Sequence, residues 1–138
     1  MTNYFGAMGT ALFNALTGGT SPTALITALG GSSVYSDQAP DGAALPYVVY
    51  SHAGGGPENN PAGMRNNIWN VRAYAATKAQ AVNVDAQIDA LLTGQALTVS
   101  GFTNFWTVRE DDISLVENPP DGGRIYMSGA LYRVRLGY

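Results

Sequence analysis

The 138-residue sequence contains no cysteine, which excludes disulfides, thiolate zinc ligands and a cysteine nucleophile. Charged residues are also scarce, at 12% of the chain. We interpret this low charge density as a surface partly covered by another subunit. The seven basic residues are scattered, and the formal net charge is −3. Tight DNA binding is therefore disfavoured, because it usually requires a basic patch that neutralises phosphates.

Long apolar stretches are absent as well. No segment approaches the roughly 20 apolar residues that span a bilayer, and the N-terminus lacks the basic and apolar regions of a signal peptide. We therefore expect neither membrane insertion nor secretion. The length is that of one ordinary domain, and no repeat or linker divides the sequence. We expect a single domain over residues 1–138.

Three segments carry apolar residues at helical spacing. A helix is predicted over 4–16, ended by Gly18-Gly19, with Phe5, Met8, Leu12 and Leu16 on one stripe. Ser21-Pro22 has the form of an N-cap followed by proline at the first helical position, which predicts a second, short helix. Thr77 should cap a third helix, ended by Gly94. Its apolar positions are Ala81, Val84, Ile88, Leu91 and Leu92.

Extended segments account for most of the remaining sequence. Residues 47–53 and 67–75 should form an antiparallel hairpin, in which Trp69 and Val71 face the core. Other features are a brief strand at 34–35, turns at 40–42 and 118–123, short strands at 96–99, 104–110 and 113–117, and a long strand from Arg124 onward. The predicted fold class is α+β, a mainly antiparallel sheet packed with about three helices.

The predicted core combines the helical stripes with the inner faces of the strands. It consists of Leu12, Leu16, Leu25, Leu29, Val49, Trp69, Val71, Val84, Ile88 and Leu91.

Residue chemistry alone predicts no catalytic, cofactor-binding or metal site. Ser51 and His52 could suggest a nucleophile and its base, but neighbours in a strand point to opposite faces. A polar strand end is the favoured interpretation, and a small hydrolase using His52 with an acidic residue is the alternative. The triplet Glu110-Asp111-Asp112 is better explained as a solvated strand connection than as a cation site. A ligand pocket under the Trp69 face is a further alternative.

Two segments are candidate contact surfaces. In the last strand, Arg133 and Arg135 share one face with Leu131, and this face is either an ordinary surface or an intersubunit contact. The stretch 54–66, rich in Gly, Pro and Asn, is expected to be a mobile hairpin tip used for binding. The predicted interface residues are Gly54, Gly55, Gly56, Glu58, Asn59, Asn60, Arg65, Arg133, Arg135 and Tyr138.

A series of short motifs resembles the tail-completion, or tail-terminator, proteins of long-tailed bacteriophages over nearly the whole chain. In order, they are Val34-Tyr35, Ala39-Pro40, residues 45–49, His52, Trp69 with Val71 and 73–75, a helix with Ala81 and Ile88, and residues 131–134. The glycine-rich stretch after His52 departs from many relatives.

The resemblance implies a structural virion protein at the head–tail junction, assembled in the host cytoplasm, without catalysis or cofactor. Such a protein forms a six-membered ring on the tail tube, stops its polymerisation and offers a surface to the head-completion complex. The implied partners are copies of the chain itself, the tail tube protein and the head-completion connector, while DNA passes through the lumen without tight binding. Another neck or tail-tube component, such as a head-completion adaptor, is the alternative.

Overall fold

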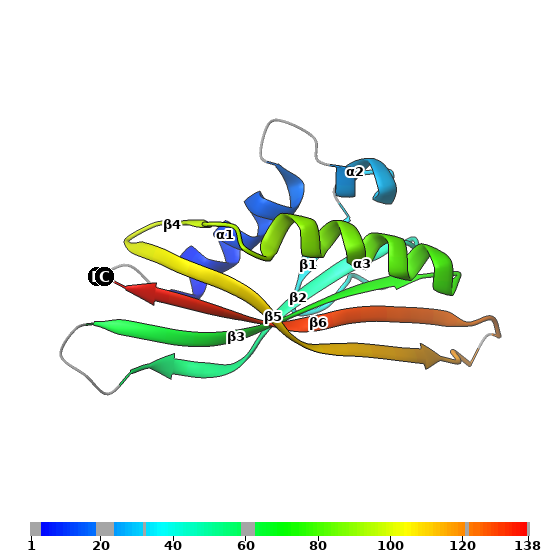
Figure 1. Ribbon diagram of the computed structural model, residues 1–138. Helices are drawn as coiled ribbons and strands as arrows, with labels where there is room; N and C mark the ends of the chain where they lie inside the picture. The colour runs from blue at the N-terminus through cyan, green and yellow to red at the C-terminus, as the bar shows by residue number, and fades with distance from the viewer. Residues whose placement is uncertain (1–3, 19–23, 32, 59–62, 121, 138) are drawn as a thin grey trace.

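The computed structural model describes residues 4–18, 24–31, 33–58, 63–120 and 122–137. Within these residues the chain forms one six-stranded sheet in the order β1-β2-β3-β6-β5-β4, with the helices on one face (Figure 1). β1 pairs with β2 in parallel, and all other pairs are antiparallel. The predicted α+β class is confirmed. The strands are β1 Val34–Ser36, β2 Tyr47–Pro57, β3 Met64–Ala75, β4 Thr98–Val99, β5 Phe102–Glu117 and β6 Ile125–Gly137.

The helices are α1 Tyr4–Thr17, α2 Ala24–Leu29 and α3 Lys78–Leu92. Thr77 caps α3 as predicted, since its side chain accepts a hydrogen bond from the Gln80 backbone N–H at 3.2 Å. In α1 the buried stripe starts at Tyr4, so the placement of Phe5, which is 57% exposed, was wrong. The predicted cap at Ser21-Pro22 lies outside the described residues. Among the described helices, none has the length and hydropathy to cross a membrane.

The predicted hairpin of β2 and β3 is confirmed, but both strands are longer than expected. Residues 54–57 pair with residues 65–68, so the prediction of a mobile tip was wrong for this part of it. Glycine makes the extension possible, because Gly55 has a φ of +83° and a Cβ there would lie 2.2 Å from the Asn66 carbonyl oxygen. β2 ends at Pro57 and β3 starts at Met64, and residues 59–62 of the predicted tip lie outside the described residues.

β5 is one 16-residue strand rather than the two short strands predicted at 104–110 and 113–117. Its pairing with β6 shifts register between Asn104 and Trp106 and again between Arg109 and Asp111. These irregularities interrupt the alternation of faces, which explains why the sequence pattern suggested a break. The acidic triplet therefore lies inside a strand, not in a connection between strands. The predicted turn before β6 is confirmed, with Gly122 N–H donating to the Pro119 carbonyl at 3.1 Å.

The core lies between the helices and the inner face of β2, β3 and β6. Eight predicted core residues are buried: Leu12, Leu16, Leu25, Leu29, Trp69, Val71, Val84 and Ile88. Val49 was wrongly included, because its neighbours Val48 and Tyr50 face the helices, and Leu91 is only partly buried, beside the buried Leu92. Burying a large aliphatic side chain contributes about 1.5–3 kcal/mol, so this layer holds the helices on the sheet.

Candidate assembly surface

The outward face of β6 carries the two arginines that the sequence singled out. Tyr132, Val134 and Leu136 are buried, whereas Arg133 and Arg135 are part-exposed on the sheet face opposite the helices, which we call the helix-free face. The predicted division of β6 into two faces is therefore confirmed. Tyr138 lies outside the described residues.

Both arginines pair with carboxylates of the same chain. Arg133 donates to both Glu110 oxygens, and its Nη1 donates to Asn66 Oδ1 at 3.0 Å. The bonds to Glu110 raise the pKa of Arg133 above its ordinary value. Arg135 Nη1 lies 2.7 Å from Glu58 Oε1. Since such part-exposed pairs contribute little to stability, these groups can exchange an internal partner for one on another chain.

The structure separates the remaining predicted interface residues. Glu58 reaches Arg135 on the helix-free face. Arg65 lies on the helix side, with its guanidinium carbon 4.1 Å from the centre of the Tyr4 ring. The three glycines from 54 to 56 form part of the β2 ladder, and Asn59 and Asn60 lie outside the described residues. The described members of the predicted set therefore lie on both faces of the sheet, and their role in contacts with another chain stays a prediction.

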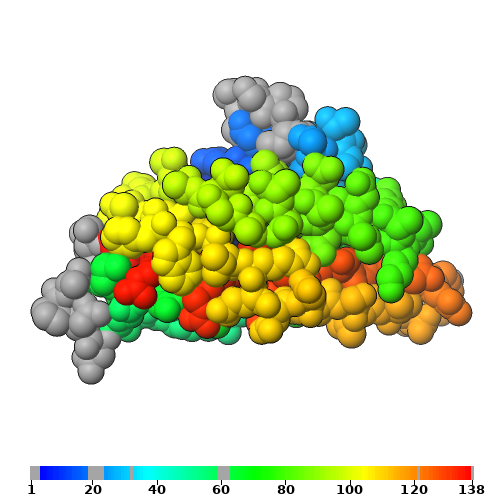
Figure 2. Space-filling model, in the orientation of Figure 1, coloured from blue at the N-terminus to red at the C-terminus, as the bar shows by residue number. Residues whose placement is uncertain are grey.

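An exposed apolar surface on β5 was missed by the sequence analysis. Eight large hydrophobic residues of the described chain are exposed, and five of them lie on β5, so these exposed groups are concentrated on one element. We use the name β5 surface for these exposed side chains, which are Phe105, Trp106, Val108, Leu115 and Val116. They are not all on one face of the sheet, because the consecutive Leu115 and Val116 point to opposite faces. β5 runs along the visible face of the molecule in Figure 2. Concentrations of exposed apolar side chains mark interaction sites, and the run of aromatic and aliphatic residues in 105–108 was the available sequence signal.

The backbone edge of β5 is also open. β4 covers only Phe102 and Thr103 on this edge, and Gly94 N–H donates to the Thr107 carbonyl at 2.9 Å. From Val108 to Glu117, no strand within the described residues pairs with the outer edge. An unpaired, partly apolar strand edge is a template on which another chain can add.

Arg109 and Asp85 form the other large polar feature, on the helix side of β5. Arg109 Nη1 and Nη2 each lie 2.9 Å from one Asp85 oxygen, and Ser128 Oγ donates to Asp85 at 2.8 Å. Arg109 also donates to Tyr132 Oη at 3.0 Å and pairs with Asp112. The bonds to Asp85 raise the pKa of Arg109, and burial raises that of Tyr132. Because these charges are paired, the network serves to hold α3 on β5 and β6.

The residues weighed for catalysis do not converge on a reactive site. His52 pairs across the ladder with the buried Trp69, whereas Ser51 pairs with Asn70 on the other face, as the alternation predicted. The His52 ring packs against Phe5, at 5.1 Å between centroids, and against Trp69, at 5.3 Å.

The other two alternatives also find no support in the geometry. On the helix side, Trp69 packs against the rings of Tyr4, Tyr50 and His52, and its Nε1 donates to the Tyr4 hydroxyl at 2.7 Å. The acidic triplet is divided, because Glu110 pairs with Arg133 and Asp112 with Arg109. Over the described parts of the chain, no cluster of three or more His, Asp and Glu residues is placed to hold a metal ion.

Comparison with known proteins adds a family and a fold. The sequence matches the family described as tail completion protein gp17 over residues 10–124. A solved chain from the virion of a native gene transfer agent particle is similar with a TM-score of 0.73 and 18% identity, covering 100% of both chains. A second solved chain, whose name states no function, has a TM-score of 0.58 and 11% identity, covering 97% of this chain and 96% of that one. At these identities the likeness shows the fold alone. No curated protein matches the sequence.

Proposed function

Because the chain belongs to the tail completion protein gp17 family, and is therefore a tail component of a phage-like virion, we propose that it forms a ring on the end of the tail tube. The ring stops tube polymerisation and presents a joining surface to the head-completion complex. Six copies form the ring, the number that the resemblance to tail terminators implies. The role is structural and involves no catalysis or cofactor.

The β5 surface is the observation that carries this proposal. A subunit in a closed ring contacts two neighbours through two different surfaces, so it must expose apolar groups that are covered only after assembly. β5 offers five exposed apolar side chains, and three of them lie in the stretch from Val108 to Glu117, where no strand of the described residues pairs with its outer edge. The low charge content agrees with a perimeter that is hidden in the ring. The net charge of −3 also suits a conduit, because a lumen that bound phosphates tightly would retard DNA.

A matched pair of substitutions tests the proposal. Leu115 on β5 is 53% exposed, and Val82 on α3 is 49% exposed, so glutamate at either position should leave the melting temperature nearly unchanged. Leu115→Glu should produce overlong tails that lack heads, because it buries a charge in the ring contact. Val82→Glu should give normal tails. The measurement is the tail length distribution, and the fraction joined to heads, in electron micrographs of particles complemented with each variant.

Four outcomes would count against this assignment. Normal, head-joined tails with Leu115→Glu would remove β5 from the assembly contact, and equal defects in both variants would show that the effect is not specific to β5. Purified wild-type protein that grows into long tubes by itself would instead favour a tube component. Protein that stays on isolated heads rather than on tubes would favour a head-completion adaptor.

A further inference from the structure

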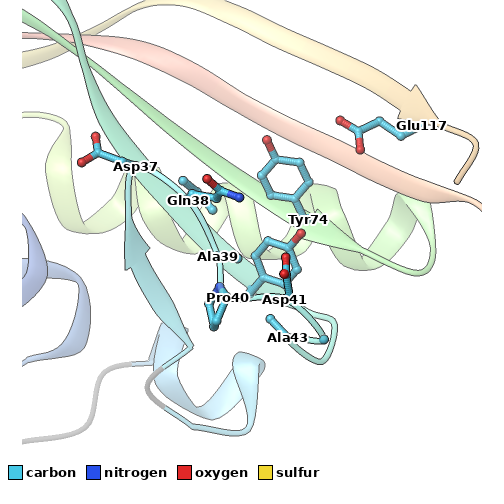
Figure 3. Close-up of a pocket in the computed structure, with 11 residues that line it drawn as sticks. Asp37, Gln38, Ala39, Pro40, Asp41, Ala43, Tyr74 and Glu117 are labelled. Carbon is cyan, nitrogen blue, oxygen red and sulfur yellow. The ribbon is translucent and has the colours of Figure 1, made fainter.

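A pocket of about 380 Å³ opens on the helix-free face where β2 begins and β3 finishes, away from the tip of their hairpin. The segment from Asp37 to Ala43 forms one wall, and Tyr74 belongs to the sheet beside it (Figure 3). Val49 of β2 also lines the pocket. Glu117, at the end of β5, closes another side. The pocket therefore gathers residues from three distant parts of the sequence.

Tyrosines line the sheet side of this pocket. Tyr47 and Tyr74 are ladder partners, and their rings stack with centroids 5.1 Å apart and an interplanar angle of 24°. Tyr35 packs edge-on against Tyr47 at 6.1 Å. The pKa of Tyr47 is raised by burial, with further contributions from Tyr74 and Glu117. The electron-rich face of a tyrosine ring attracts a cation, so this wall favours a positively charged ligand.

The pocket also gathers most of the described acidic residues that have no ion pair. Within the described residues, the acidic members of ion pairs are Glu58, Asp85, Asp89, Glu110 and Asp112. Of the acidic residues that the structure describes, Asp37, Asp41, Asp111 and Glu117 have no ion pair, and all of these except Asp111 line the pocket. No basic side chain is among the described residues that line it. An anionic ligand such as a DNA phosphate would be repelled there.

We propose that this pocket is a docking site for an arginine side chain of another protein in the particle. A guanidinium is flat and permanently charged, so it can stack on a tyrosine ring while its N–H groups bond carboxylates. The ammonium of lysine is compact and more strongly hydrated, and fits such a wall less well. The inference rests on the proposed function only in that the occupant is a neighbouring protein of the assembly.

The occupant is a different protein rather than a second copy of this chain. Arg109, Arg133 and Arg135 are engaged in ion pairs, and Arg65 packs over the Tyr4 ring. Arg72 donates to Asn70 and is the ladder partner of the pocket residue Val49, so it lies beside the pocket itself. Arg124, which has no ion pair within the described residues, precedes Ile125, the ladder partner of Glu117, so it lies at the same end of the molecule as the pocket. A head-to-tail ring contact requires complementary groups on different sides of the subunit. A tube or connector protein can supply the arginine from another direction.

The binding test uses purified, isotope-labelled protein and N-acetyl-arginine-amide, followed by two-dimensional NMR. Backbone amide shifts should concentrate at Tyr47, Val49 and Tyr74. N-acetyl-citrulline-amide, which has the same shape without the charge, should produce none. The double variant Asp41→Asn/Glu117→Gln should weaken binding by about three- to tenfold, since it removes two exposed charge contacts. Asp111→Asn removes the unpaired carboxylate outside the pocket and should change nothing.

Several results would overturn the inference: no shifts at the highest soluble arginine-amide concentration, equal shifts with the citrulline compound, or equal weakening by Asp111→Asn. Melting temperatures of all variants verify that each is folded. The assay is independent of tail assembly. Arginine binding together with normal tails from Leu115→Glu would reject the proposed function and keep the pocket. No arginine binding together with overlong, headless tails from Leu115→Glu would reject only the pocket.

Discussion

Asp85 is the residue on which the contact between α3 and the sheet depends most. It is 7% exposed and accepts hydrogen bonds from Arg109 and Ser128. Asp85→Ala leaves the Arg109 charge, only 21% exposed, without its bidentate partner. We expect a loss of about 2–4 kcal/mol in the free energy of unfolding, measured by urea denaturation.

Asp89 on the same helix provides the control for this prediction. Its side chain is 42% exposed, and its carboxylate lies 4.0 Å from Arg109. Asp89→Ala should therefore cost less than about 1 kcal/mol. Equal losses for the two variants would show that the buried bonds of Asp85 do not dominate this contact.

The buried Tyr4 should make the free energy of unfolding decrease at alkaline pH. Burial raises its pKa from 10.0 to about 12, so the folded protein retains the phenol proton over a range in which the unfolded chain loses it. The contribution of the buried Tyr4 phenol to the free energy of unfolding is complete below pH ~10 and declines as the pH rises toward ~12. Tyr4→Phe should lower stability at neutral pH, because Trp69 Nε1 loses its acceptor, but it should flatten the decline above pH ~10.

Urea unfolding at a series of alkaline pH values measures that slope. Tyr47, Tyr50 and Tyr132 also have raised pKa values, so part of the decline will persist in the variant. An identical slope in both proteins would show that Tyr4 titrates similarly in the folded and unfolded chains.

At the scale of elements, the end of the β2–β3 hairpin depends on one glycine. Gly55 combines a φ of +83° with a carbonyl oxygen 2.2 Å from the position of a Cβ. Gly55→Ala should therefore destabilise the protein by about 2 kcal/mol, since both the left-handed conformation and the backbone contact penalise a side chain. Gly54 has an ordinary φ and open space around its Cβ position. Gly54→Ala should stay within about 1 kcal/mol of the wild type.

Amide hydrogen exchange locates the effect within the hairpin. Gly55→Ala should speed exchange at Asn66 and Asn67, the ladder partners of Gly56 and Gly55, and leave α3 protected. Unchanged exchange at these two amides would mean that residues 54–57 do not pair in solution. That result would instead support the mobile tip expected from the sequence.

At the scale of the whole molecule, the role of Arg133 in contacts with another chain stays a prediction. Arg133→Glu places two carboxylates side by side, because Glu110 is its internal partner. Arg133→Glu with Glu110→Arg restores that pair in reverse. If Arg133 also contacts a neighbouring chain, the double variant should keep the wild-type melting temperature and still assemble poorly. Restored assembly would identify a purely internal ion pair.

The sequence by itself determined the features that neighbouring residues encode. The helical stripes, the Thr77 cap and the two faces of β3 and β6 arise from local periods of 3.6 and 2 and from local hydrogen bonding. The outward placement of Arg133 and Arg135 followed from the same alternation. These signals require no knowledge of the partner element, so they could be read before the fold was known.

Only the tertiary structure decided the features that depend on distant pairing. Pairing with β6 makes β5 one continuous strand. The two register shifts in this pairing interrupt the alternation of faces, so the exposed side chains of β5 could not be predicted from the sequence pattern. The glycines from 54 to 56 indicate a loop in the sequence, but pairing with residues 65–68 places them in a β-ladder. Asp85 forms an ion pair with Arg109, and Glu117 lines the same pocket as Tyr47 and Tyr74. These residues are too far apart in the sequence for a local pattern to predict their contact. The positions of the pocket carboxylates and of the exposed apolar side chains on β5 therefore depend on how the strands pair.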